Sequence, residues 1–194
     1  EGDIERVEHG LVEADCTNPE NEIRWVKVAT SDMSTCGIDE EFNVHCWSSI
    51  TNDMSMIPNE PFQDIAVHDL YACGLTLTQE LRCWTFMNDG HVPNDLVTPP
   101  SGQYIALSLA NTHGCAIRQD NQHVDCWGGA FSSFQSEVPP VPYQLIRSGK
   151  DITCGVNNQG FAQCFGEQLY GEYIFDYLPV VDIAFSGNLG VCAI

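Results

Sequence analysis

Ten cysteines are the residues of this chain with the clearest capacity for chemistry, and eight of them form pairs around a short polar segment. The members of a pair stand ten or eleven positions apart, as in "STCGIDEEFNVHCW" (34–47). Such pairs could bind a metal ion, exchange electrons or form a disulfide. The chain contains no Cys-x-x-Cys, which weakens a zinc ribbon and a thioredoxin-type redox pair. A structural disulfide is therefore the favoured hypothesis, with metal or redox use as the alternatives.

The cysteine pairs recur with a period of about 39 residues, so they belong to an internal repeat. A fifth first member, Cys192, stands near the C-terminus without a partner downstream, and Cys16 near the N-terminus has the neighbours of a second member. The two leftover cysteines thus complete a fifth unit that is split between the chain ends. The predicted pairs are Cys36–Cys46, Cys73–Cys83, Cys115–Cys126, Cys154–Cys164 and Cys16–Cys192.

The residues around each pair alternate as they do in β-strands. In the first copy, aliphatic Ile38 follows Cys36 by two positions and Val44 precedes Cys46 by two. Residues two apart share one face of a strand, so a turn near Glu41 places Cys36 opposite Cys46. Opposed residues in an antiparallel pair come within about 4.5 Å between Cα atoms, which a disulfide can span. Each repeat therefore predicts a β-hairpin that one disulfide joins.

An aromatic residue follows the second cysteine in four copies and falls on the opposite face of its strand. Packing between neighbouring sheets is the favoured role for these rings, and a ring of sugar-stacking platforms is the alternative. The four residues are Trp47, Trp84, Trp127 and Phe165.

A period of about 39 residues with short strands and no helical periodicity is typical of a β-propeller blade. We expect an all-β fold, a single five-bladed β-propeller over residues 1–194. The N-terminal strand would close the last blade, and proline-rich segments would form the outer edges. The repeats span about residues 25–61, 62–103, 104–142, 143–179, and 180–194 together with 8–18.

These repeats resemble the regulator-of-chromosome-condensation repeat family, and "HGCAI…HVDCWGG" (113–129) is the closest copy. The resemblance spans about residues 8–194 and implies a propeller. Members commonly have seven blades, whereas this chain has five units. An interface known from a seven-bladed member therefore cannot be assigned to this chain. The nucleotide-exchange and chromatin-binding activities of the family do not transfer to so acidic and cysteine-rich a chain. Extracellular members, such as plant receptor-kinase ectodomains, are the nearer analogy.

The charge balance excludes several classes of partner. The chain has 27 Asp and Glu against 7 Lys and Arg, a formal net charge of −20. Nucleic-acid binding needs a basic surface, so no nucleic-acid partner is expected.

No apolar run approaches the roughly 20 residues of a membrane span, so no membrane insertion is expected. Ten cysteines indicate an oxidising compartment, which predicts a secreted, extracellular protein.

No catalytic motif is present, the six histidines are scattered along the chain, and no carboxylate recurs at one repeat position. We therefore expect no enzyme activity, no catalytic residues and no required cofactor or metal. The segment "MNDGHVPNDL" (87–96) could hold calcium, although a solvated loop is the favoured interpretation. Residues outside the repeat pattern are the candidate ligand contacts: Phe86, Asp89, Asp95, Phe131, Phe134, Tyr170 and Tyr173.

Three functional hypotheses follow. The first is a secreted, non-enzymatic binding module whose loops bind a protein or glycan ligand, because a propeller presents several loops on a rigid scaffold. The second is an acidic structural or matrix protein that associates with calcium. The third is an extracellular hydrolase, since propellers can hold the paired carboxylates of a glycosidase.

Overall fold

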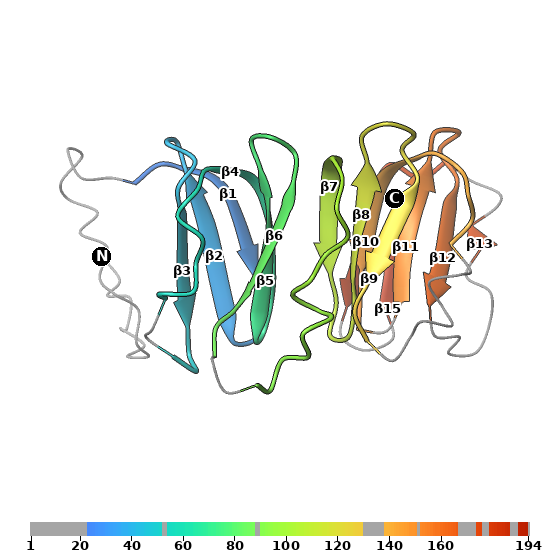
Figure 1. Cartoon of the computed structure of the whole chain (residues 1–194). Coiled ribbons are helices and arrows are strands. Elements are labelled where there is room, and N and C mark those ends of the chain that lie inside the picture. Colours follow the sequence, from blue (N-terminus) through green and yellow to red (C-terminus); the bar gives the residue numbers. More distant parts are fainter. Residues whose placement is uncertain are drawn as a thin grey trace, which may run out of the picture.

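The computed structural model describes residues 23–51, 54–87, 90–129, 138–150, 152–166, 174–175, 179–186 and 190–193. These residues form an all-β structure of small antiparallel sheets that stand side by side (Figure 1). No part of the described chain forms a helix that could cross a membrane.

Each sheet corresponds to one sequence repeat and is called a blade here. Blade 1 contains β1 (Trp25–Thr30), β2 (Ser34–Asp39) and β3 (Val44–Ser48), and blade 2 contains β4 (Phe62–His68), β5 (Tyr71–Thr76) and β6 (Leu81–Thr85). Blade 3 contains β7 (Tyr104–Leu109), β8 (Gly114–Arg118) and β9 (Val124–Trp127). Blade 4 contains β10 (Tyr143–Ser148), β11 (Ile152–Asn157), β12 (Ala162–Gly166) and β13 (Ile174–Phe175). A final pair contains β14 (Ile183–Ser186) and β15 (Gly190–Ala193).

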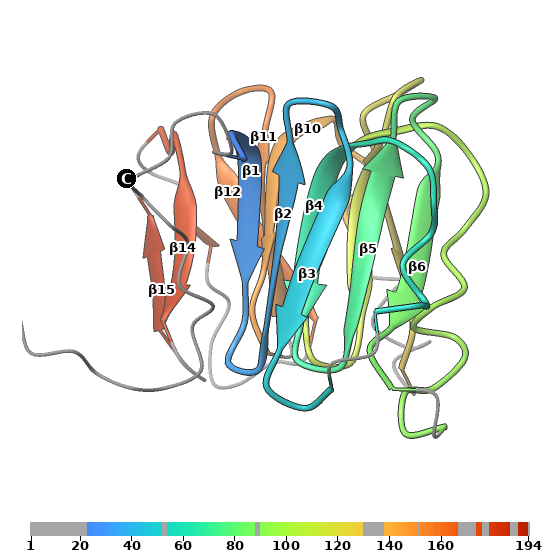
Figure 2. The ribbon, with the colours of Figure 1, turned by 90° about the vertical axis from the view of Figure 1, so that its left-hand side faces the viewer.

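Successive blades meet through their first strands. β1 contacts β4, β4 contacts β7, β7 contacts β10, and β10 contacts β14, so the first strands line the inner side of the arrangement. Figure 2 shows the blades from the side of blade 1, with β14 and β15 to the left of β1. Small sheets arranged around a common central axis are the architecture of a β-propeller. The predicted all-β propeller fold is therefore confirmed.

The second and third strands of each blade form the predicted hairpin. In blade 1, Cys36 lies opposite Cys46 and Ile38 lies opposite Val44. Four disulfides join the opposed strands: Cys36–Cys46, Cys73–Cys83, Cys115–Cys126 and Cys154–Cys164. Cys192 lies on β15 opposite Ala184, just as Cys36 lies opposite Ala29. Cys16 lies outside the described residues, so the fifth disulfide stays a prediction.

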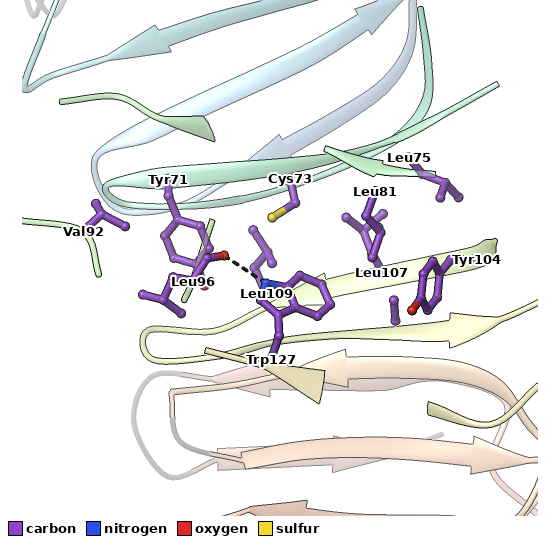
Figure 3. Close-up of a cluster of buried hydrophobic side chains, with 11 residues drawn as sticks. Tyr71, Cys73, Leu75, Leu81, Val92, Leu96, Tyr104, Leu107, Leu109 and Trp127 are labelled. Atoms are coloured by element: carbon purple, nitrogen blue, oxygen red, sulfur yellow. Dashed lines mark hydrogen bonds between the residues drawn. The ribbon is translucent and has the colours of Figure 1, made fainter. Parts of the chain in front are cut away.

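The core consists of layers between neighbouring blades. Between blades 2 and 3, Leu75 and Leu81 face Tyr104 and Leu107, while the indole of Trp127 donates a 2.9 Å hydrogen bond to the carbonyl of Leu96 (Figure 3). Similar clusters join blade 1 to blade 2 and blade 3 to blade 4. Stability therefore depends on contacts between successive repeats as well as on contacts within each repeat.

An aromatic ring at the start of three first strands covers the glycine that follows the first cysteine. A Cβ at Gly155 would lie 2.5 Å from Cδ1 of Tyr143, and a Cβ at Gly37 would lie 2.5 Å from Cε3 of Trp25. This separation is below van der Waals contact, so a larger residue would displace the ring. In blade 3 the equivalent residue is Ala116, which lies fully buried in the core.

The hairpin tips join each blade to the next. The tip residues Phe42, Gln79 and Gln122 have φ values of 66°, 67° and 60°, and Gly160 has 84°. Each tip carbonyl accepts a backbone hydrogen bond of 2.7–2.9 Å from the next repeat. The donors are the N–H groups of Phe62, Tyr104, Tyr143 and Val180. The positive φ of these tip residues therefore directs their carbonyl groups toward the following blade.

Replacing Gly160 by alanine is expected to lower the free energy of unfolding by about 1–2 kcal/mol, because an L-residue is strained at this φ. A Cβ at Gly160 would lie 3.7 Å or more from neighbouring atoms, so no steric clash adds to the strain. The reciprocal change, Gln79→Gly, is expected to raise stability by up to about 1 kcal/mol. Urea denaturation of both variants measures the difference. A stabilised Gly160→Ala variant would contradict the role given to the backbone conformation.

Candidate ligand-binding groove

A groove of about 430 Å³ runs along the outer edge of blade 1. One wall is the outer strand with the end of its turn, residues 43–47, and the other wall is the proline-containing segment before β4. Its polar lining includes Asn43, His45, Asn59 and Glu60. We call this feature the outer groove, and its volume lies in the range of about 300–1,000 Å³ that is usual for ligand pockets.

Asp39 organises the turn that leads into the outer groove. Its Oδ1 accepts hydrogen bonds of 2.9 Å from the backbone N–H groups of Glu41 and Asn43. Its Oδ2 lies 2.8 Å from Nε2 of His45, so the carboxylate also orients the imidazole that lines the groove. Burial acts to raise the pKa of Asp39, but the hydrogen bonds from His45, Asn43 and Glu41 outweigh it and hold the pKa below its ordinary value of 3.8.

Replacing Asp39 by alanine is expected to lower the free energy of unfolding by about 1–2 kcal/mol, because the turn loses its main acceptor. Asparagine keeps an acceptor oxygen, so Asp39→Asn is the matched control with a smaller loss. Since the pKa of Asp39 is lower in the folded state, its stabilisation is present above pH 3.8 and is lost as the pH falls through the folded pKa. Urea titrations at neutral and acidic pH measure both effects. An alanine variant that loses as much stability in acid as the parent would contradict this role.

Blade 3 carries a counterpart of the outer groove, with a volume of about 370 Å³. Asp125 takes the place of His45, directly before the second cysteine of its blade. Pro58 and Pro139 line the two grooves, and each stands four residues before the buried aromatic that begins the next blade. The same type of hollow therefore recurs on two blades, with different polar side chains in its walls.

Blade 1 also has an exposed aromatic face next to the outer groove. The indole rings of Trp25 and Trp47 lie edge-to-face with centroids 5.3 Å apart, and Trp47 is 44% exposed. The equivalent rings Trp84, Trp127 and Phe165 pack against the preceding blade and are at most 8% exposed. The predicted inter-blade packing is confirmed for these three. It is wrong for Trp47 within the described residues, because none of them forms a blade against that face.

Five basic side chains among the described residues pair with carboxylates. Arg118 contacts Asp120 and Asp125, at 3.0 and 2.9 Å, and these hydrogen bonds raise its pKa. Arg24, Lys27, Arg82 and Arg147 also have carboxylate partners. Because acidic residues greatly outnumber basic ones, many carboxylates have no cation to pair with and the surface stays acidic. Such a surface attracts cationic partners.

The structure describes two of the candidate ligand contacts from the sequence, Phe86 and Asp95. Phe86 is 3% exposed and packs with Trp84 in the core between blades 1 and 2, so its prediction as a ligand contact is wrong. Asp95 is exposed in the segment after β6, where the N–H of Leu96 donates to the carbonyl of Pro93. The remaining candidates lie outside the described residues: Asp89, Phe131, Phe134, Tyr170 and Tyr173.

The described residues contain no group of three or more His, Cys, Asp or Glu placed to hold a metal ion. Within the calcium candidate 87–96, Asn88 and Asp89 lie outside the described residues. His113 has a structural contact, since its Nε2 lies 2.8 Å from Oγ1 of Thr153 in the next blade. The sequence analysis did not foresee this bridge between blades.

Sequence reasoning also missed the outer groove. Two signals could have pointed to it: the proline four residues before the first-strand aromatic, and the polar residue directly before the second cysteine. Neither signal says that the two segments leave a hollow between them, because they belong to different parts of the repeat. The width of the space between the two segments depends on how the outer segment crosses the blade.

No protein-family model matches the chain. Among solved structures, the entire ectodomain of the Physcomitrella patens receptor kinase CR4 is 25% identical, with a TM-score of 0.70 over 86% of this chain and 49% of that one. The CRINKLY WD40 ectodomain of the Arabidopsis thaliana receptor kinase ACR4 is 22% identical, with a TM-score of 0.59 over 75% of this chain and 51% of that one.

Yeast RCC1 (Prp20), in its structure bound to Kap60, is 16% identical, with a TM-score of 0.56 over 75% of this chain and 44% of that one. The chain thus spans about half the length of each of these proteins. The likenesses support the β-propeller fold that the blades display and agree with the resemblance noted in the sequence.

Proposed function

We propose that this chain is an extracellular, non-enzymatic recognition module that binds a protein or glycan ligand at the outer groove of blade 1. The outer groove itself carries the proposal. It is a hollow of ligand size with one wall formed by a disulfide-joined hairpin, and its lining presents His45, Asn59 and Glu60. Polar groups on a rigid support lose little conformational entropy when they bind, which favours recognition.

Two further observations support this proposal. The four disulfides suit an oxidising compartment outside the cell. The 25% identity to a receptor-kinase ectodomain supports the same compartment. Because the chain spans only about half of that ectodomain, the function of the whole protein is part of the proposal.

The experiment is a binding screen of the purified, oxidised chain against a glycan array and a panel of extracellular protein domains. For any ligand found, His45→Ala and Asn59→Ala should each weaken binding by about tenfold, as loss of a well-placed polar contact does. Gln144→Ala, an exposed change on β10 far from the groove in sequence, is the control and should bind as the parent does. A ligand whose affinity ignores both groove variants would overturn the assignment of the site.

We also propose that Cys16 and Cys192 form the fifth disulfide and that residues 8–18 complete the blade that begins with β14 and β15. The register of β15 supports this, since Cys192 occupies the position of the first cysteine of each blade. The chain would then be one five-bladed domain. Non-reducing proteolysis and mass spectrometry should find a peptide that joins Cys16 to Cys192, and a free thiol at either position would contradict it.

A further inference from the structure

Blade 4 shows what can occupy the outer edge of a blade in this protein. Its third strand, β12, is paired on its outer side by the short strand β13. The pairing places Ala162 opposite Phe175 and Gln163 opposite Ile174. A short extended segment therefore fits against this edge of the repeat without disturbing the disulfide hairpin beneath it.

The matching edge in blade 1 forms one wall of the outer groove. Counted from the second cysteine, Val44 and His45 correspond to Ala162 and Gln163 of blade 4. Both line the outer groove, and no strand among the described residues pairs with the outer side of β3. The described part of the segment that follows β3 turns and bends and forms no strand. The groove therefore lies where the fourth strand of blade 4 lies.

The backbone of β3 presents hydrogen-bonding groups to this space. The Cα atoms of Cys36 and Cys46 are 4.1 Å apart, the close spacing of a pair that exchanges no backbone hydrogen bonds. The N–H and C=O groups of Cys46, and of Val44 two residues earlier, consequently point away from β2 and toward the groove. In blade 4, Ala162 is the equivalent of Val44, and it is paired with Phe175.

The charges around the outer groove select the kind of strand that would fit. Glu60 lines one wall of the groove and forms an ion pair with Arg82 at 3.2 Å, while Asp39 holds His45 in the other wall. The chain as a whole carries a formal charge of −20. Lysine or arginine side chains on an added strand would be attracted, and acidic ones repelled.

From these observations we infer that the outer groove of blade 1 binds an extended, basic segment of a partner protein by β-strand addition. The segment takes the place that β13 takes in blade 4 and pairs with the outward backbone groups of Val44 and Cys46. Main-chain hydrogen bonds give the affinity, and the strongly acidic chain favours a basic segment. This inference rests on the proposed recognition role and names the partner class for the same site.

The test is a titration of the isotope-labelled, oxidised chain with the peptide acetyl-Lys-Val-Lys-Val-Lys-amide, followed by amide NMR. We expect shifts and slowed hydrogen exchange at the amides of Val44 and Cys46. The matched peptide acetyl-Glu-Val-Glu-Val-Glu-amide should bind about tenfold more weakly because of charge repulsion. A Lys/Val peptide with N-methyl groups on alternate residues cannot form the ladder, so its binding should be lost.

Variants of the protein test the same contact. Val44→Pro removes one outward N–H and should weaken the Lys/Val peptide about fivefold to tenfold. Val124→Pro, the equivalent change in blade 3, should leave the blade 1 shifts unchanged. The N-methylated peptide reports on the same hydrogen bonds in the unaltered protein, so the test does not depend on the folding of Val44→Pro.

Equal binding of the N-methylated peptide, or binding that leaves the amides of Val44 and Cys46 unshifted, would overturn strand addition. If the Lys/Val peptide does not bind but the ligand screen finds a glycan or folded domain that depends on His45, strand addition is wrong and the recognition role stands. If neither experiment finds a ligand at the outer groove, both proposals are wrong.

Discussion

Replacing Tyr143 by alanine is expected to lower the free energy of unfolding by about 3–5 kcal/mol, the usual loss for a fully buried aromatic side chain. Tyr143 begins blade 4, is 0% exposed, and lies in the core layer between blades 3 and 4 with Ile117 and Ile146. Its ring also covers Gly155 and meets the ring of Phe165 at a centroid distance of 6.2 Å. Alanine would leave a cavity that the joined hairpins cannot close by collapse.

Phenylalanine is the matched control at this position. The Tyr143 hydroxyl donates a 3.2 Å hydrogen bond to Oε1 of Gln163, and this is the contact that Tyr143→Phe removes. Burial raises the pKa of Tyr143 to about 12, so the hydroxyl stays protonated over the physiological range. We expect Tyr143→Phe to lose about 1 kcal/mol or less in urea denaturation. Equal losses for the two variants would show that the hydroxyl, and not the ring, carries the stabilisation.

Removing one hairpin disulfide by the double change Cys115→Ala and Cys126→Ala is expected to lower stability by about 2–4 kcal/mol. The physical reason is that the unfolded chain gains conformations once its short loop is opened. Chemical denaturation of the oxidised variant against the oxidised parent measures the loss. A loss below about 0.5 kcal/mol would contradict a stabilising role for the disulfide.

A second hairpin provides the control. The Cys154–Cys164 loop has a sequence separation of 10, and the Cys115–Cys126 loop has one of 11. The loop-entropy term depends on the logarithm of loop length, so the two double variants should differ by well under about 1 kcal/mol. Cys115 and Cys154 are both fully buried, so their replacement also changes core packing. A larger difference in stability between the two variants would therefore come from packing around one of the pairs.

The core of the fold followed from patterns that lie close together in the sequence. The Cys36–Cys46 hairpin spans eleven residues, with aliphatic residues two positions inward from each cysteine. A strand shows its two faces at period two, and a short turn leaves one register that brings both cysteines together. Strand pairing, the four disulfides and the burial of Trp84, Trp127 and Phe165 could therefore be predicted from the chain itself.

Other features depended on elements that are far apart in the sequence. Phe86 follows the hairpin of blade 2 as if it began a loop, yet it packs in the core with residues of blade 1. Trp47 has the sequence context of a buried ring, yet it lies exposed because the described residues place no blade against it. In both cases burial is set by the neighbouring blade, and that neighbour cannot be read from the residue's own repeat.

What the sequence by itself determined is the repeating unit: an alternating hairpin, a cysteine pair with an aromatic residue after its second member in four copies, and an acidic composition. These properties come from local side-chain periodicity and from composition, which do not depend on contacts with distant parts of the chain. Only the tertiary structure decided where the outer segment of each repeat runs. It leaves a groove beside β3 and supplies the strand β13 beside β12. The reason is physical: proline-containing outer segments have no strong strand preference, so their course depends on the space that the stacked blades leave for them.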